Sequence, residues 1–179
     1  AKGVRIRTMS DRMTVADPDE DLVDIPPPGQ LKALLKAAAE FDATGRAEAF
    51  IHIQMFAGLR MSELRGIRRS KDLDLTNQAP KVKVRQRADK WNQLGIVKSK
   101  AAKRDIPIGP GTAQALRRWS LACPTGDLDL LFPTGIGTVE SLANYYNRLW
   151  IPLMEAAGLV TETVEGDGSR KLAPFFSHH

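Results

Sequence analysis

The stretch that most restricts how this chain can fold is the apolar run at residues 47–59, AEAFIHIQMFAGL. It is the most apolar helix candidate in the sequence, so we expect it to lie at the centre of the core. The run leads directly into Arg60, and Glu63 follows three residues later. Residues three apart on a helix are neighbours, so Glu63 can orient Arg60 or balance its charge.

The remaining helices are predicted from the helical spacing of their apolar residues, at 29–41, 111–123, 138–150 and 152–159. Pro152 is expected to end or kink the helix before it, because proline lacks the backbone N–H that a helix interior needs. Residues 161–174 are polar and contain glycine, which favours a mobile loop.

Between these helices the sequence changes to short segments, KDLDL, KVKVRQR and LGIVKSKAAKRDIPI, with turn residues between them. Partial alternation and valine content favour half-exposed strands. We therefore predict an α+β fold that is mostly helical, with a small three-stranded antiparallel sheet.

Positive charge is concentrated in one quarter of the chain. Residues 60–104 contain 14 basic and 4 acidic residues, a net charge of +10, whereas the whole chain of 179 residues has a net charge of +5. Such a block is the electrostatic footprint of a nucleic-acid-binding protein. A solvated surface is the plainer alternative, and a net charge this concentrated favours DNA or RNA binding over it.

Several classes of chemistry find no support in the sequence. GPGTAQAL lacks the Gly-Lys-Ser/Thr ending of a phosphate-binding P-loop, and no Gly-x-Ser-x-Gly motif is present. One cysteine and three histidines do not provide the usual ligands of a zinc site. No stretch approaches the length of a membrane helix, and a single cysteine suits a reducing cytoplasm, so we predict a cytoplasmic protein without a membrane partner.

The motifs AGLRMSEL, VKSKAAKRDIPI, LFPT and AAGL, in this order, resemble the catalytic domain of a tyrosine recombinase, or phage-type integrase. The resemblance runs over residues 26–179 and implies a DNA-breaking and rejoining fold encoded by a bacterium or phage. Residues 1–25 would be a linker or extended arm. Such enzymes cleave DNA through a 3′-phosphotyrosine, use no cofactor or metal, and act as a tetramer on double-stranded DNA.

The resemblance also implies roles for individual residues. Arg60 matches the first catalytic arginine, which binds the scissile phosphate, and Glu63 is a supporting residue. Lys98 fits the lysine that protonates the leaving oxygen, and Lys100 on the same strand stays an alternative. The other basic residues of the block would contact phosphates without reading sequence; they are Arg65, Arg68, Arg69, Lys71, Lys83, Arg85, Arg87 and Lys103.

The sequence also departs from the family pattern. No His-x-x-Arg box is complete, although His178 or His179 could open one; a purification tag would explain the same two residues. The two tyrosines, Tyr145 and Tyr146, precede that point, so we expect neither to be the nucleophile. We therefore predict a C-terminally incomplete catalytic domain that does not cleave DNA by itself. A DNA-binding module of the same fold that never cuts is the alternative, and RNA binding is a more distant one.

Overall fold

The structure, a computed structural model, describes residues 26–76, 78–97, 100–164 and 169–176. Its helices are α1 (Pro28–Phe41), α2 (Arg46–Ala57), α3 (Met61–Leu64), α4 (Pro110–Ala122), α5 (Leu142–Tyr145) and α6 (Ile151–Ala156). Its strands are β1 (Leu73–Asp74), β2 (Lys81–Val84), β3 (Gln86–Ala88), β4 (Leu94–Ile96), β5 (Arg104–Pro107), β6 (Val160–Val164) and β7 (Arg170–Pro174). Within these residues, no helix combines the length and apolar character needed to cross a membrane.

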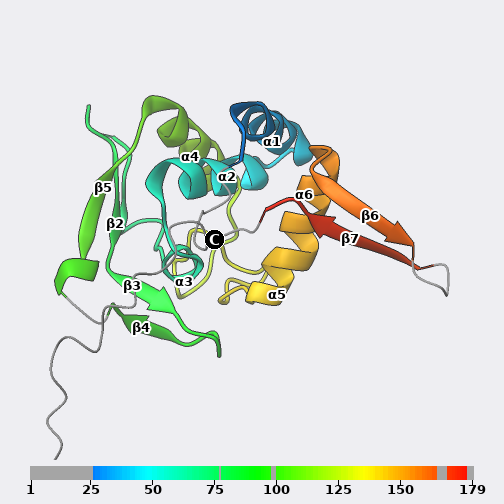
Figure 1. Cartoon of the computed structure of the whole chain (residues 1–179). Coiled ribbons are helices and arrows are strands. Elements are labelled where there is room, and N and C mark those ends of the chain that lie inside the picture. Colours follow the sequence, from blue (N-terminus) through cyan, green and yellow to red (C-terminus); the bar gives the residue numbers. More distant parts are fainter. Residues whose placement is uncertain (1–25, 77, 98–99, 165–168, 177–179) are drawn as a thin grey trace, which may run out of the picture.

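Helix α2 lies in the core, as its apolar sequence predicts. It packs against α1 and α4 (Figure 1). Its residue Phe50 is 1% exposed and contacts two other buried rings, with centroid distances of 5.9 Å to Phe132 and 5.3 Å to Tyr145. The helix ends at Ala57 because Gly58 has a φ of 57°, a left-handed conformation that glycine adopts without strain.

The predicted three-stranded antiparallel sheet is present, in the order β1-β2-β5. Val82 and Val84 of β2 are buried, and Lys81 and Lys83, which alternate with them, point to the other face. The prediction was incomplete, because the segments KVKVRQR and LGIVKSKAAKRDIPI also form a separate hairpin, β3–β4. This hairpin continues from one end of the sheet (Figure 1).

The helical run that contains Pro152 does not end at this residue. A π-helical turn, Tyr146–Trp150, connects α5 to α6, and the Ile151 N–H donates to the Tyr146 carbonyl five residues back. Pro152 follows within the first turn of α6. Proline is tolerated in a first helical turn, and the wider π turn is the local adjustment that precedes it.

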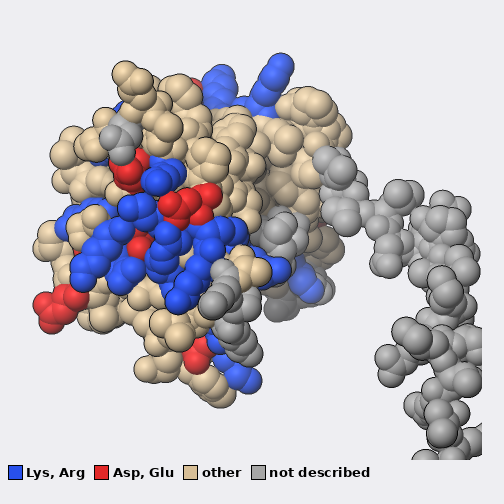
Figure 2. All heavy atoms as spheres, turned by 90° about the vertical axis from the view of Figure 1, so that its left-hand side faces the viewer, with Lys and Arg blue, Asp and Glu red and all other residues tan. Residues whose placement is uncertain are grey.

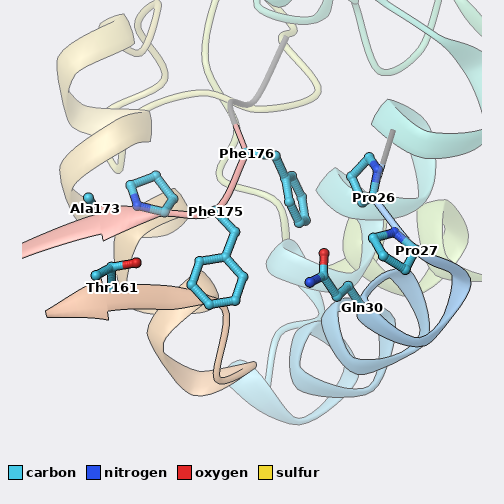
Figure 3. Close-up of a pocket in the computed structure, with 8 residues that line it drawn as sticks. Pro26, Pro27, Gln30, Thr161, Ala173, Phe175 and Phe176 are labelled. Atoms are coloured by element: carbon cyan, nitrogen blue, oxygen red, sulfur yellow. The ribbon is translucent and has the colours of Figure 1, made fainter. Parts of the chain in front are cut away.

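The prediction of a loop at 161–174 is wrong for the residues that the structure describes there. Strands β6 and β7 pair as an antiparallel hairpin, from Val160 opposite Pro174 to Val164 opposite Arg170. Phe175 and Phe176 follow the hairpin and face Pro26, Pro27 and Gln30 across a pocket of about 500 Å³ (Figure 3). The Phe176 ring lies 6.1 Å from that of Trp150, so the end of the described chain is packed against the helical core.

Candidate nucleic-acid interface

The site begins at the connection between α2 and α3. Leu59 and Met61 are 4% and 5% exposed, whereas Arg60 between them is exposed. The backbone of Arg60 is extended, with φ −67° and ψ 147°, and α3 begins at the next residue. Two buried neighbours fix the backbone in the core, so the guanidinium of Arg60 reaches the surface from a rigid base.

Glu63 binds the backbone of Arg60 and the side chain of a different arginine. Its carboxylate accepts the Arg60 N–H at 3.0 Å and two guanidinium bonds from Arg104, at 2.8 and 2.9 Å. Glu63 is 3% exposed. Burial alone would raise the pKa of Glu63, but the Arg104 hydrogen bonds, the Arg60 N–H and both positive charges together hold it below its ordinary value.

Arg104 is a site residue that the sequence did not reveal. It lies in β5 opposite Val84, so it belongs to the inward face of the sheet, where its partner is Glu63. Strand alternation contained a signal, since Arg104 shares the face of Ile106, and an inward-facing charge requires a buried partner. That partner is 41 residues away in sequence, and spacing alone does not identify it.

Arg60 and Arg104 line one pocket of about 380 Å³, together with Gly58, Ala101 and Ala102. The only ionisable side chains among these lining residues are the two guanidiniums. Arginine stays charged at any working pH and donates in a planar geometry that suits phosphate oxygens. The charge and donor groups of this pocket suit an anionic group such as a phosphate.

The turn that begins at Lys100, one of the two candidate lysines, borders this pocket. Lys100 begins the 3-10 turn Lys100–Ala102, and Ala101 and Ala102 of this turn are part of the pocket lining. Lys98 lies outside the described residues, so the choice between Lys98 and Lys100 stays a prediction. His178 and His179 also lie outside the described residues, and their catalytic role stays a prediction as well.

The fold of this chain is similar to those of DNA recombinases of known structure. XerA recombinase has a TM-score of 0.55 at 19% identity, over 79% of this chain and 46% of that chain. The Tn1549 transposon integrase in complex with circular intermediate DNA has a TM-score of 0.61 at 23% identity, over 78% and 48%. A variant of that integrase reaches 0.62 at 22% identity, over 85% and 49%. No protein-family model and no curated protein matches the sequence.

The chain has the fold of a tyrosine recombinase catalytic domain. It spans just under half the length of each of these recombinase chains. The AGLRMSEL motif forms the junction of α2 and α3, beside the pocket that Arg60 and Arg104 line.

Basic side chains gather on the outer face of the β1-β2-β5 sheet. Lys81 and Lys83 project from β2 on the face opposite to its buried valines, and Asp105 of β5 pairs with Lys83 across the strands. Asp105 binds Arg85 and also Lys81, the latter at 3.1 Å, and these hydrogen bonds lower the pKa of Asp105. Lys and Arg side chains gather on the side of the molecule that carries β2 and β5 (Figure 2).

The burial of Arg65 contradicts its predicted role as a phosphate contact. It is 1% exposed, and its guanidinium donates to the Glu140 carbonyl at 2.7 Å, to the Asp89 carbonyl at 3.2 Å and to the Asn92 side chain. A buried guanidinium with these partners cannot reach DNA, so Arg65 is a structural residue. The sequence places it among exposed basic residues, and only its distant partners reveal the burial.

Arg68 and Arg69 are engaged with protein acceptors. Arg68 forms a bidentate pair with Asp72, at 2.8 Å for both bonds, and Arg69 donates to the Cys123 carbonyl at 3.2 Å. Both side chains remain about a quarter exposed. The DNA contacts of Arg68 and Arg69 stay predictions. The same holds for the other basic residues of this set, which are Lys71, Lys83, Arg85, Arg87 and Lys103.

The two tyrosines of the chain lie outside the lining of the Arg60 pocket, as far as the structure describes it. Tyr145 is 2% exposed, and its hydroxyl donates to the Phe132 carbonyl at 2.9 Å. Burial raises the pKa of Tyr145 far above its ordinary value, which opposes formation of a nucleophilic phenolate. Tyr146 is partly buried and packs against the core.

Proposed function

We propose that this chain is part of a site-specific DNA recombinase that breaks and rejoins double-stranded DNA during integration or excision. The observation that carries the proposal is the pocket in which Arg60 and Arg104 meet, in the fold of a tyrosine recombinase catalytic domain. The DNA in complex with the Tn1549 integrase supports DNA as the substrate of this chain as well.

In the proposed reaction a tyrosine hydroxyl attacks a DNA phosphate and displaces the 5′-oxygen, which leaves a 3′-phosphotyrosine. The transition state places additional negative charge on the non-bridging oxygens. Arg60 stabilises that charge most effectively if it is fixed before the reaction begins. Leu59 and Met61 provide this fixation, because both are buried on either side of it.

The leaving 5′-oxygen needs a proton, and we assign this proton transfer to Lys98, with Lys100 as the alternative. This assignment is supported by Ala101 and Ala102 of the 3-10 turn that begins at Lys100, because both belong to the pocket lining. A substrate with a 5′-phosphorothiolate has a leaving group that needs no acid. It should rescue Lys98→Ala and not Arg60→Ala; rescue of Lys100→Ala in its place would move the assignment to Lys100.

The nucleophile, by this proposal, is not among the 179 residues. Tyr145 is buried and its hydroxyl is hydrogen-bonded in the core, and Tyr146 packs against the same core. Both observations argue against either tyrosine as the group that attacks a phosphate held by Arg60. The second catalytic arginine is also expected outside the chain, with His178 or His179 opening its motif. Other protomers on the same DNA, in a tetramer, would complete the recombination complex.

A nicked duplex that traps the covalent intermediate tests the proposal. The full-length protein that contains this chain should form a denaturation-resistant adduct with the duplex, and Arg60→Ala in that protein should form none while it retains most of its DNA affinity. The 179-residue chain should bind the duplex without an adduct. An adduct with the chain alone would refute the assignment of the nucleophile, and an adduct with Arg60→Ala would refute the role of Arg60.

The second candidate function is a DNA-binding module that uses the same fold without cleavage. It is favoured by one observation, the burial of Tyr145 in the part of the chain that is described. The same experiment separates the two functions. Duplex binding by the full-length protein, with no adduct on the nicked duplex at any protein concentration, would favour the binding module.

A further inference from the structure

The β3–β4 hairpin presents an exposed tryptophan at its tip. Trp91 is 71% exposed, whereas the other two tryptophans of the chain, Trp119 and Trp150, are 3% and 5% exposed. A tryptophan side chain has a large apolar surface, and burial of the kind seen for Trp119 and Trp150 is favourable for it. Ile96, at the end of β4 away from the turn, is also 75% exposed.

The turn that carries Trp91 is held in one conformation. The Asp89 carboxylate accepts the N–H groups of Trp91 and Gln93, at 2.8 and 2.9 Å, and Asn92 takes up a φ of 62°. The buried guanidinium of Arg65 binds the Asp89 carbonyl and the Asn92 side chain from below. A turn tied to the core in this way holds Trp91 outward with little conformational entropy left to lose on binding.

The tip combines an aromatic ring with a cation. The Lys90 ammonium lies 4.9 Å from the centre of the Trp91 ring. A ring of this kind packs well on the apolar surface of deoxyribose and base edges, and the ammonium suits a neighbouring phosphate. The two groups together are complementary to a nucleic-acid strand, in which apolar sugars alternate with anionic phosphates.

The length of the connecting chain limits how far the tip can lie from the Arg60 pocket. Residues 91 to 100 connect Trp91 to the turn that lines the pocket. Nine fully extended residues span at most about 30 Å. One turn of B-DNA is about 34 Å long, so the tip lies no farther from this turn than about one helical turn of a duplex.

We propose that Trp91 and Lys90 form a second DNA contact, in which the ring packs on sugar and base edges and the ammonium binds an adjoining phosphate. This inference rests on the proposed DNA-binding function and adds a contact away from the catalytic pocket. It predicts that the hairpin tip binds the duplex beside the cleavage site. Loss of the Trp91 side chain should weaken DNA binding and leave the phosphate pocket intact.

Tryptophan fluorescence tests the contact in the intact chain. Acrylamide should quench Trp91 and leave the two buried tryptophans largely unaffected. A saturating duplex, with binding followed separately through a label on the DNA, should protect Trp91 from quenching. In Trp91→Phe the remaining fluorescence should respond neither to acrylamide nor to DNA, which assigns the signal.

Affinity measurements complete the test. Trp91→Ala should weaken duplex binding about tenfold, which equals about 1.4 kcal/mol, and Trp91→Phe should weaken it less. The matched control is Leu121→Ala, which removes a 91% exposed apolar side chain on α4 and should leave affinity unchanged. The Trp91 backbone N–H makes the turn bond, so the alanine variant should keep the fold, as unchanged circular dichroism would verify.

Three results would overturn the inference. If the duplex binds and Trp91 stays fully quenchable, the tip does not contact DNA, although the proposed function survives. If the duplex does not bind at all, both fail. If anionic vesicles, or a higher protein concentration without DNA, protect Trp91 where DNA does not, the tip is a membrane or self-association surface.

Discussion

Replacing Glu63 with glutamine tests whether this carboxylate connects α3 to β5. Three hydrogen bonds converge on it, one from the Arg60 N–H and two from Arg104. Bonds to charged groups contribute about 1.5–3 kcal/mol each. Glutamine keeps one acceptor oxygen but turns an NH₂ group toward a donor, and water compensates part of the loss because Arg104 is 35% exposed. We expect the free energy of unfolding to fall by about 2–3 kcal/mol, or Tm by about 5–10 °C.

The effect of Glu63→Gln should depend on pH, because the pKa of Glu63 is lowered in the folded chain. A carboxylate of this kind stabilises the fold fully above its unfolded pKa, and the contribution disappears as the pH falls through the lowered folded pKa. The difference between wild type and Glu63→Gln should therefore be largest near neutral pH and shrink in acid. Urea unfolding followed by circular dichroism at several pH values measures this difference directly.

A matched control separates the buried carboxylate from exposed ones. Glu162 also binds an arginine, Arg170, at 3.0 Å, but its side chain is 44% exposed. Exposed ion pairs contribute little to stability, so Glu162→Gln should leave Tm unchanged. An equal effect of the two substitutions, or a Glu63→Gln effect that does not change with pH, would refute the role assigned to Glu63.

Three further substitutions test the surroundings of the site in thermal or urea unfolding. Arg65→Ala leaves the Glu140 and Asp89 carbonyls and the Asn92 side chain without this donor and should cost about 3–5 kcal/mol, at about 1–3 kcal/mol for each unpaired acceptor; a loss below about 1 kcal/mol would contradict its structural role. Gly66→Ala places a Cβ 2.8 Å from the Cα of Arg87, which should cost about 1–3 kcal/mol, and an unchanged Tm would show that the backbone yields. Tyr145→Phe leaves the Phe132 carbonyl unpaired and should cost about 1–2 kcal/mol, whereas equal stability would indicate that water replaces the hydroxyl.

The parts of the fold that local sequence determines were predictable. The apolar run at 47–59 correctly indicated a core helix, and the position of Arg60 at its end followed from the change to polar residues. The β6–β7 hairpin was missed because most of its residues are exposed, so neither strand alternates between apolar and polar residues. Pairing with the facing strand, which no local pattern encodes, forms this hairpin.

The parts of the site that depend on distant partners were not predictable. Arg65 and Arg104 are both basic residues in a basic block, and the sequence does not identify the partner of either one. Arg65 is buried because Glu140, 75 residues away, provides an acceptor, and Arg104 turns inward because Glu63 is buried beneath it. In each case a tertiary partner decides whether an arginine faces solvent or the core.

The salt dependence of duplex binding tests the central claim, that the Arg60 pocket holds a DNA phosphate. Each phosphate contact contributes about 0.9 to the slope of log K against log salt concentration. Arg60→Ala should make the slope of the 179-residue chain shallower by about that amount. The control is Arg148→Ala, an exposed arginine on the π-helical turn, which Figure 1 places across the molecule from β5, and its slope should match wild type. An unchanged slope in Arg60→Ala would contradict the claim.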